Sequence, residues 1–144
     1  MVDHDRFEDG WMGVDFDGTL AQYDGRAGAD ELGEPISLMV MRTKRWIAEG
    51  KDVRVFIARV NPDVGDGSEE ERKVYVSNCL RAIEGWCLKH LGKILPVTHQ
   101  KDFQMIESYD DRAVTVERNT GKILTMGREF DDEASDPIGF FLDG

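Results

Sequence analysis

The sequence is poor in cysteine and proline and contains no long apolar run. Of 144 residues, two are Cys and four are Pro. Cys79 and Cys87 lie eight residues apart in one predicted helix, so their Cα atoms are about 12 Å apart. A disulfide needs less than about 7 Å, so we expect two buried thiols in a reducing compartment. No apolar stretch approaches the roughly 18 residues of a membrane span, and charged residues 1–9 lack the apolar core of a signal peptide. We therefore expect a soluble, cytoplasmic protein.

Basic residues are also scarce. Lys and Arg number 18 against 29 Asp and Glu, a net charge of −11. Such a charge repels a nucleic-acid backbone, and no basic patch offsets it, which argues against a nucleic-acid partner. Part of this charge lies in residues 127–144, which we predict to be either a disordered acidic tail or an arm docked through Phe140 and Phe141.

The order of elements predicts a single α/β domain over residues 1–126, followed by the tail. Strand, helix, strand, helix, strand is typical of a parallel sheet covered on both faces. The expected architecture is a three-layer, Rossmann-like domain with a mainly parallel central sheet. The predicted strands are 11–16, 53–57, 94–97, one within 105–109, and 113–116. The predicted helices run from Pro35 to Gly50 and from Ser68 to Leu91. Asn119-Thr120-Gly121 is a predicted turn that can form a hairpin.

The most informative motif follows the first predicted strand. Asp15-Phe16-Asp17-Gly18-Thr19 ends an apolar run. Strand side chains alternate between faces, so Asp15 and Asp17 point the same way. Two carboxylates that close repel each other unless a cation or a proton relieves the repulsion. Mg²⁺ is the natural partner, because it takes oxygen ligands and keeps positions open for phosphate. The alternative is a surface turn, where Asp-Gly is common.

This motif resembles the nucleophile motif of the haloacid dehalogenase-like (HAD) superfamily, most of whose members are Mg²⁺-dependent phosphotransferases. The resemblance implies that Asp15 attacks phosphorus and forms an aspartyl-phosphate. It implies that Asp17 protonates the leaving oxygen and then deprotonates the hydrolytic water. Backbone N–H groups of Phe16, Gly18 or Thr19 would cradle the phosphate oxygens.

Later segments match the superfamily in part. After the second strand relatives carry a Ser or Thr that holds phosphate, whereas this chain has Ile57. Phosphate would then be held by backbone N–H groups or by another hydroxyl, such as Thr98. Arg59 keeps an Arg that is frequent in the family, and it is either a substrate ligand or a solvated charge at the strand end. Lys101 matches the family's cation, which would offset the charge of the transferring group.

The resemblance also implies an acidic pair after the fourth strand, which Asp110 and Asp111 match. The expected Mg²⁺ ligands are Asp15, the backbone carbonyl of Asp17, and Asp110, with Asp111 acting through water. Only eight residues separate Lys101 from Asp110, which leaves no room for the helix that many relatives carry there.

No segment is long enough for the cap domain with which many HAD enzymes select substrates. Fourteen residues lie between Leu20 and Pro35, and three between Val97 and Lys101. We therefore expect a capless member whose open site has a rim formed by loops 22–34 and 61–67. An open site suits a large phosphorylated substrate, or a small one closed over by a second copy of the chain in a homo-oligomer.

Two alternatives to a phosphomonoesterase remain. The hydroxyl missing at Ile57 is consistent with a non-catalytic phosphate- or Mg²⁺-binding module of HAD-like fold. The run Asp17-Gly-Thr-Leu-Ala21 followed by Gly25-Arg26 also resembles polynucleotide-end phosphatases, although the negative charge argues against that substrate.

Overall fold

A computed structural model of the chain describes residues 9–125, which divide into two compact units at the junction of Tyr109 and Asp110. The predicted tail, with Phe140 and Phe141, lies outside the described residues. The two units are described separately.

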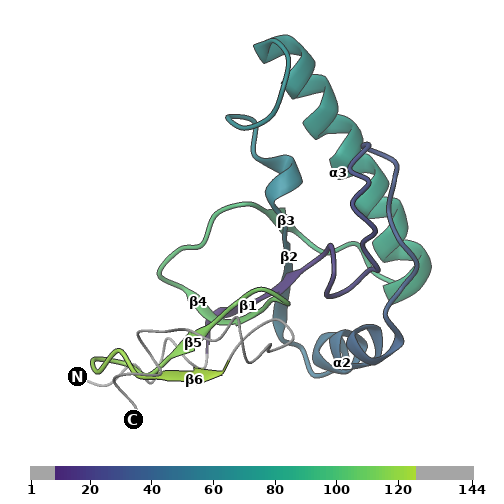
Figure 1. Cartoon of the computed structure of the whole chain (residues 1–144). Coiled ribbons are helices and arrows are strands. Elements are labelled where there is room, and N and C mark those ends of the chain that lie inside the picture. The colour runs from purple at the N-terminus through teal and green to yellow at the C-terminus, as the bar shows by residue number, and fades with distance from the viewer. Residues whose placement is uncertain (1–8, 126–144) are drawn as a thin grey trace. The chain divides into compact units, whose positions relative to one another are not determined.

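The first unit is an α/β structure around a parallel sheet of four strands in the order β3-β2-β1-β4 (Figure 1). The parallel α/β fold predicted from the sequence is therefore confirmed. Val14 in β1 pairs with Val55 on one side and Tyr109 on the other, so β1 is a central strand. The strands are β1 (Trp11–Asp15), β2 (Asp52–Phe56), β3 (Val97–Thr98) and β4 (Met105–Tyr109). The helices are α2 (Ser37–Ala48), the short 3₁₀ helix η1 (Ala58–Val60) and α3 (Glu69–Leu91).

The predicted third strand is wrong by several residues. Residues 94–97 were expected, whereas β3 is Val97–Thr98. Leu95 is buried in the hydrophobic core, and the carbonyl of Pro96 accepts a hydrogen bond of 2.8 Å from the N–H of Val55. The apolar character of this segment therefore reflects burial before the strand begins.

Both helices pack on one face of the sheet. Val14, Val53 and Val55 point to this face and form one core with buried residues of α3, against which Val40 and Trp46 of α2 pack. Figure 1 shows α2 and α3 on one side of β2 and the segment 99–104 on the other. The prediction of a three-layer sandwich is not met within residues 9–109, where no helix covers the second face.

No helix covers the second face within residues 9–109 because the segment that joins β3 to β4 is short. These strands are at opposite edges of the sheet, roughly 14 Å apart at about 4.8 Å per strand spacing. The crossing also runs back along the strands, because Thr98 lies level with Asp15 and Met105 lies level with Trp11, which is about 13 Å away along β1. The path is therefore about 19 Å, and the seven steps from Thr98 to Met105 reach at most about 23–25 Å, so residues 99–104 run nearly extended and cannot form a helix. The second face is instead packed with side chains, where Arg54 lies 4.8 Å above the ring of Trp11 and Trp11 donates a 2.8 Å hydrogen bond to Asp102.

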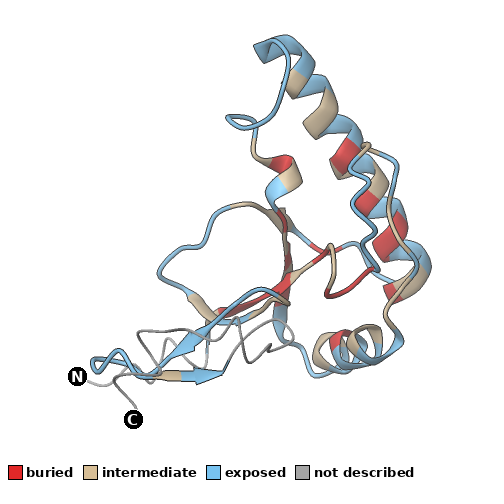
Figure 2. Ribbon diagram, in the orientation of Figure 1, coloured by how far each residue is buried: buried red, intermediate tan, exposed pale blue. Residues whose placement is uncertain are grey.

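Helix α3 has the ends that its sequence predicts. Ser68 accepts a hydrogen bond from the N–H of Glu71, and the Glu71 side chain accepts one from the N–H of Ser68, which completes a capping box. Gly92 ends the helix with φ 78°, a left-handed conformation that favours glycine. Cys79 and Cys87 are buried free thiols on the side of α3 that faces the core, as expected. Figure 2 shows that the buried residues gather in the strands and on that side of α3.

The second unit, described over residues 110–125, contains an antiparallel pair of short strands. β5 (Thr115–Val116) pairs with β6 (Ile123–Thr125). The connecting turn has positive φ at Asn119 (69°) and Gly121 (83°), so the predicted hairpin turn is confirmed. Across the described part of the chain, no helix has the length and apolar character needed to cross a membrane.

Candidate active site

Asp15 and Asp17 lie at the carboxyl end of β1, at the point where the direction of strand addition reverses. From β1 the chain adds β2 and β3 on one side, and it then returns to place β4 on the other. In open α/β sheets ligands bind beyond the carboxyl ends of the strands at such a switch point. Asp15 is the last residue of β1 and is half-buried, and Tyr109 ends the neighbouring β4. The sheet therefore brings the Asp pair to the position where this rule puts a site.

The turn after Asp15 is held by its own backbone. The carbonyl of Phe16 accepts hydrogen bonds from the N–H groups of Thr19, Leu20 and Ala21 at 3.3, 3.0 and 2.9 Å. Gly18 has φ 89° and donates its N–H to the carbonyl of Ala21 at 2.8 Å. The N–H groups of Gly18 and Thr19, predicted as phosphate donors, are thus committed to the turn. The Thr19 hydroxyl instead donates to Oδ2 of Asp15 at 3.4 Å, which orients that carboxylate.

Arg59 is not a solvated charge at the strand end, so that interpretation of its sequence position is wrong. Its role as a substrate ligand stays a prediction. Its side chain is 7% exposed and that of Asp17 is 18% exposed. Nε donates to Oδ2 of Asp17 at 2.7 Å and Nη2 to Oδ1 at 2.9 Å, a bidentate ion pair. Burial acts to lower the pKa of Arg59, but the hydrogen bonds and charge of Asp17 outweigh it and raise that pKa above the ordinary value.

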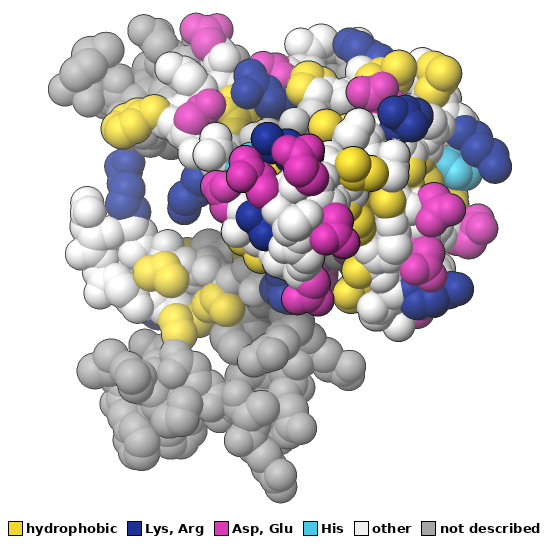
Figure 3. Space-filling view, turned by 90° about the horizontal axis from the view of Figure 1, so that it is seen from above, with side chains coloured by type: hydrophobic (Ala, Val, Ile, Leu, Met, Phe, Trp, Pro, Cys, Tyr) yellow, Lys and Arg dark blue, Asp and Glu magenta, His cyan; other side chains and the backbone are white. Residues whose placement is uncertain are grey.

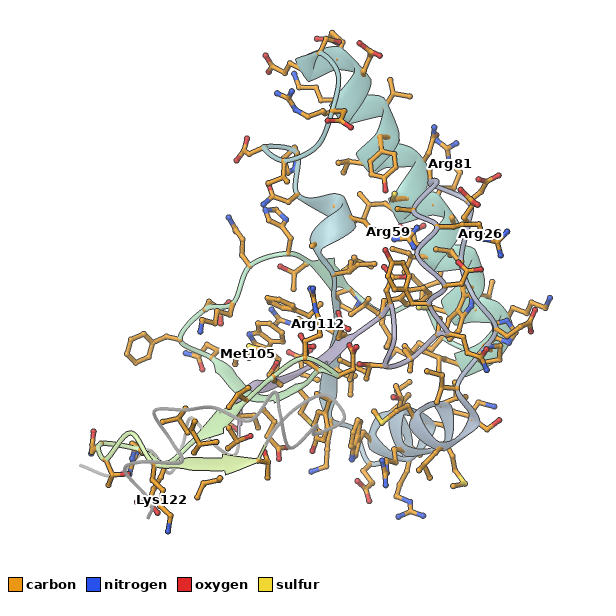
Figure 4. The ribbon with its side chains drawn as sticks, in the orientation of Figure 1. Arg26, Arg59, Arg81, Met105, Arg112 and Lys122 are labelled. Atoms are coloured by element: carbon orange, nitrogen blue, oxygen red, sulfur yellow. The ribbon has the colours of Figure 1, made fainter. Side chains whose placement is uncertain are left out.

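The same guanidinium holds loop 22–34, the predicted rim of the site. Arg59 donates through Nη1 to the carbonyl of Gly28 at 2.9 Å and through Nη2 to that of Arg26 at 3.1 Å. Between them, the carbonyl of Ala27 accepts a 2.6 Å hydrogen bond from the hydroxyl of Tyr75 in α3. Burial, with the hydrogen bond to Cys79 adding to it, raises the pKa of Tyr75 to about 12, so this hydroxyl stays a donor. Figure 4 shows Arg59 between η1 and the loop that carries Arg26.

Ile57 belongs to the core. Its side chain is 2% exposed and packs in the same apolar cluster as Val14 and Val55. Its N–H donates to the carbonyl of Thr98 at 2.9 Å. The position that aligns with the family's phosphate-binding hydroxyl therefore faces the helices, which explains why an apolar residue occupies it.

Thr98 and Lys101 follow the carboxyl end of β3. The Thr98 hydroxyl is occupied locally, because it donates to the carbonyl of Gln100 and accepts from the N–H of Gln100. Lys101 is exposed and lines a shallow hollow on the second face with Phe56, His99 and Met105. Over residues 9–125 it forms no ion pair with Asp15 or Asp17. The structure therefore does not join these two predicted site residues to the Asp pair by a direct contact.

Asp110 and Asp111 are the first residues of the second unit. Oδ1 of Asp110 accepts a 2.8 Å hydrogen bond from the N–H of Arg112, which forms a tight turn. In the chain Asp110 follows Tyr109, the last residue of β4.

The charge on the surface agrees with the composition. On the face drawn in Figure 3, Lys and Arg side chains are scattered among Asp and Glu side chains and form no continuous basic patch. No feature of that face favours a nucleic-acid backbone as a partner.

Comparison with protein-family models and with curated proteins finds no match. One solved structure, a conserved protein coded by a locus of Bacteroides thetaiotaomicron, is similar at 21% sequence identity over 73% of this chain and 78% of that chain, with a TM-score of 0.44. A likeness at this level carries no conclusion about activity.

Proposed function

We propose that the protein is a Mg²⁺-dependent, HAD-like phosphomonoesterase without a cap domain, acting through an aspartyl-phosphate on Asp15. One observation carries the proposal: Asp15 and Asp17 lie at the carboxyl end of the central parallel strand, at the topological switch point of the sheet. The bond from the Thr19 hydroxyl to Asp15 supports it, because a nucleophile must be held in one orientation.

The proposed reaction has two steps. An oxygen of Asp15 attacks phosphorus, the bond from phosphorus to the ester oxygen breaks, and Asp17 gives that oxygen a proton. Water then attacks the aspartyl-phosphate and loses a proton to Asp17, and the bond to Asp15 breaks to release inorganic phosphate. General acid and base catalysis of this kind contributes about 10²–10⁴-fold.

The residues fit a magnesium ion in part. Mg²⁺ prefers oxygen donors, and Asp15 offers a half-buried carboxylate. Both side-chain oxygens of Asp17 bind Arg59, so Asp17 would contribute its backbone carbonyl. Asp110, which follows β4 directly, would add a carboxylate, and Asp111 would act through water. The ion would offset the negative charge of the transferring phosphoryl group.

The ion pair with Arg59 constrains how Asp17 can act. Each oxygen of Asp17 uses one lone pair to accept a hydrogen bond from Arg59, which leaves its other lone pair for a proton. A protonated Asp17 has no charge to strengthen these bonds, so its contacts with Arg59 weaken in the part of the turnover in which it carries the proton. Ile57 supplies no hydroxyl, so backbone groups other than the committed N–H groups of Gly18 and Thr19 would hold the phosphate.

A panel of phosphate monoesters, assayed with Mg²⁺ and with a chelator, tests the proposal. We expect Mg²⁺-dependent release of phosphate, and Mg²⁺ alone should raise the melting temperature by ligand linkage. In Asp17→Asn the phosphorylated peptide containing Asp15 should accumulate and be detectable by mass spectrometry, whereas Asp15→Asn should carry no phosphate. Hydrolysis by Asp15→Asn at the wild-type rate would exclude the mechanism.

A non-catalytic module that binds Mg²⁺ or phosphate is the second candidate. The contacts that occupy Asp17, together with the burial of Ile57, favour it. Calorimetric binding of Mg²⁺ without turnover of any monoester would identify such a module.

A further inference from the structure

Arg59 joins two segments that are otherwise separate. The side chain of Asp17 lies after β1, and residues 26–28 lie in loop 22–34, with no hydrogen bond between the two among residues 9–125. Arg59 reaches both, with two bonds to Asp17 and two to the carbonyls of Arg26 and Gly28. Nη2 serves both sides at once, at 2.9 Å from Oδ1 of Asp17 and 3.1 Å from the carbonyl of Arg26.

The planar guanidinium makes this junction stiff. Its donors form a fixed fork, so a change in direction at one donor changes the others. With 7% of the Arg59 side chain exposed, water has little access to replace a lost partner, and leaving a buried charge unpaired is strongly unfavourable. The orientation of Asp17 and the path of residues 26–28 therefore cannot vary independently.

Tyr75 fixes the middle of the same segment. Its hydroxyl holds the carbonyl of Ala27 at 2.6 Å, so three successive carbonyls, those of residues 26–28, bind side chains of η1 and α3. Residues 26–28 are therefore held by hydrogen bonds from side chains and not by pairing with a neighbouring strand. Within the loop, the N–H of Glu31 donates to the carbonyl of Gly28 at 2.9 Å, which extends the ordered part to residue 31.

We propose that Arg59 is a positioning residue that couples the orientation of Asp17 to the conformation of residues 26–28, so that a substrate bound against loop 22–34 acts on Asp17 through Arg59. The coupling itself does not depend on any reaction. Its catalytic consequence rests on the proposed phosphatase activity, in which Asp17 carries a proton, and so binds Arg59 less strongly, for part of each turnover.

Hydrogen–deuterium exchange on the full chain tests the coupling. Asp17→Asn removes the charge that holds Arg59, and Arg59→Lys removes the fork but keeps a positive charge. In both variants we expect backbone amides of residues 24–31 to exchange at least about tenfold faster than in the wild type, because charge-assisted bonds are lost. The response to Asp17→Asn is decisive, since Asp17 itself does not hydrogen-bond these residues.

Arg72 provides a matched control. From α3 it donates to the carbonyls of Pro62 and Gly67 at 3.1 and 2.8 Å, so it anchors loop 61–67 in the same manner, and among residues 9–125 it has no carboxylate partner. Arg72→Gln should accelerate exchange in residues 61–67 and leave residues 24–31 as in the wild type. If Asp17→Asn leaves residues 24–31 fully protected, Arg59 anchors the loop without coupling it to Asp17 and the proposal is wrong.

Kinetics separate positioning from phosphate binding. Tyr75→Phe frees the carbonyl of Ala27 and leaves the pair of Asp17 and Arg59 intact, so it can be tested in place of Arg59→Lys if the Arg59 variant does not fold. Arg59→Lys and Tyr75→Phe should each lower kcat about tenfold or more, with KM and Mg²⁺ affinity within about twofold of the wild type. A raised KM at unchanged kcat would show that Arg59 binds phosphate directly and would overturn the proposal. A wild-type protein without phosphatase activity would remove the proposed function and leave the exchange test to decide the coupling.

Discussion

Replacement of Ile57 by threonine tests where this chain departs from the HAD pattern. HAD enzymes, which the sequence resembles, carry a hydroxyl at the aligned position, so Ile57→Thr introduces that hydroxyl with the same β-branched shape. In the structure, however, the side chain is 2% exposed and packs among Val14, Val55 and Val60. The substitution therefore places a hydroxyl in an apolar core instead of beside a phosphate.

The magnitude follows from two terms. Threonine is shorter than isoleucine by about one methylene, which is worth about 0.8 kcal/mol when buried. A hydroxyl buried without a hydrogen-bond partner costs a further 1–3 kcal/mol or so in proteins. We expect Ile57→Thr to lower the free energy of unfolding by about 2–4 kcal/mol. Ile57→Val removes only a methylene and should cost about 0.5–1.5 kcal/mol.

Urea denaturation measures both values on the full chain. The midpoint should fall for Ile57→Thr well below that of Ile57→Val, with the slope unchanged, because the native surface stays the same. Phosphate affinity, measured by calorimetry on the same samples, should not increase. If Ile57→Thr is as stable as Ile57→Val and binds phosphate more tightly, the side chain faces the site and the burial argument fails.

Three further predictions concern the nucleophile, a helix cap and an acid-sensitive contact. Asp15→Asn should abolish phosphate release in a monoester assay while the circular dichroism spectrum is retained, because the substitution keeps the shape and removes the attacking oxygen. Ser68→Ala breaks the capping box with Glu71 and should lower the free energy of unfolding by about 1 kcal/mol in a urea titration. The side-chain N–H of Trp11 holds the pKa of Asp102 below its ordinary value, so this contact stabilises the fold above about pH 4 and is lost as the pH falls through the lowered pKa. Trp11→Phe should therefore reduce the drop in melting temperature between pH 6 and pH 3. An unchanged drop would exclude the contact.

Local signals in the sequence were enough to predict most elements. Helix α3 begins after Ser68 and ends at Gly92 as predicted, because the capping residues and the left-handed glycine act over one helical turn. The first strand and its Asp pair were also predicted, since a buried central strand produces a continuous apolar run. The parallel order followed from the alternation of strands and helices.

The sequence already indicated that no helix lies between β3 and β4 to cover the second face of the sheet. The short distance between Lys101 and Asp110 had already excluded a helix there. Only the strand order, with β3 and β4 at opposite edges, shows that residues 99–104 must cross the whole second face. A sequence pattern predicts whether a helix or strand is present. Which face of the sheet a connecting segment covers depends on the order of the strands and the distance between them.

The role of Arg59 could not be predicted from sequence. Two of its acceptors are backbone carbonyls, of Arg26 and Gly28, and every residue type carries a carbonyl. Their position depends on the path of loop 22–34, which no periodicity encodes. The family resemblance drew attention to Arg59 and suggested a substrate role, and it gave no sign of the ion pair with Asp17.

That ion pair changes which residue distinguishes an enzyme from a binding module. From the sequence alone, the presence of Asp17 favours catalysis, because a second carboxylate beside Asp15 has no other evident purpose. In the structure Asp17 has a structural purpose as well, since it neutralises Arg59, whose side chain is only 7% exposed. Removal of one partner from a buried pair is strongly destabilising. A module without activity would therefore retain Asp17, and loss of function in Asp17→Asn could follow from a disturbed loop. Asp15 is the proposed nucleophile, and the hydrogen bonds of Arg59 go to Asp17 and to loop 22–34, so Asp15 is the residue whose replacement tests chemistry. Phosphate trapped on Asp15 identifies an enzyme, and an Asp15→Asn variant that keeps every function of the wild type identifies a binding module.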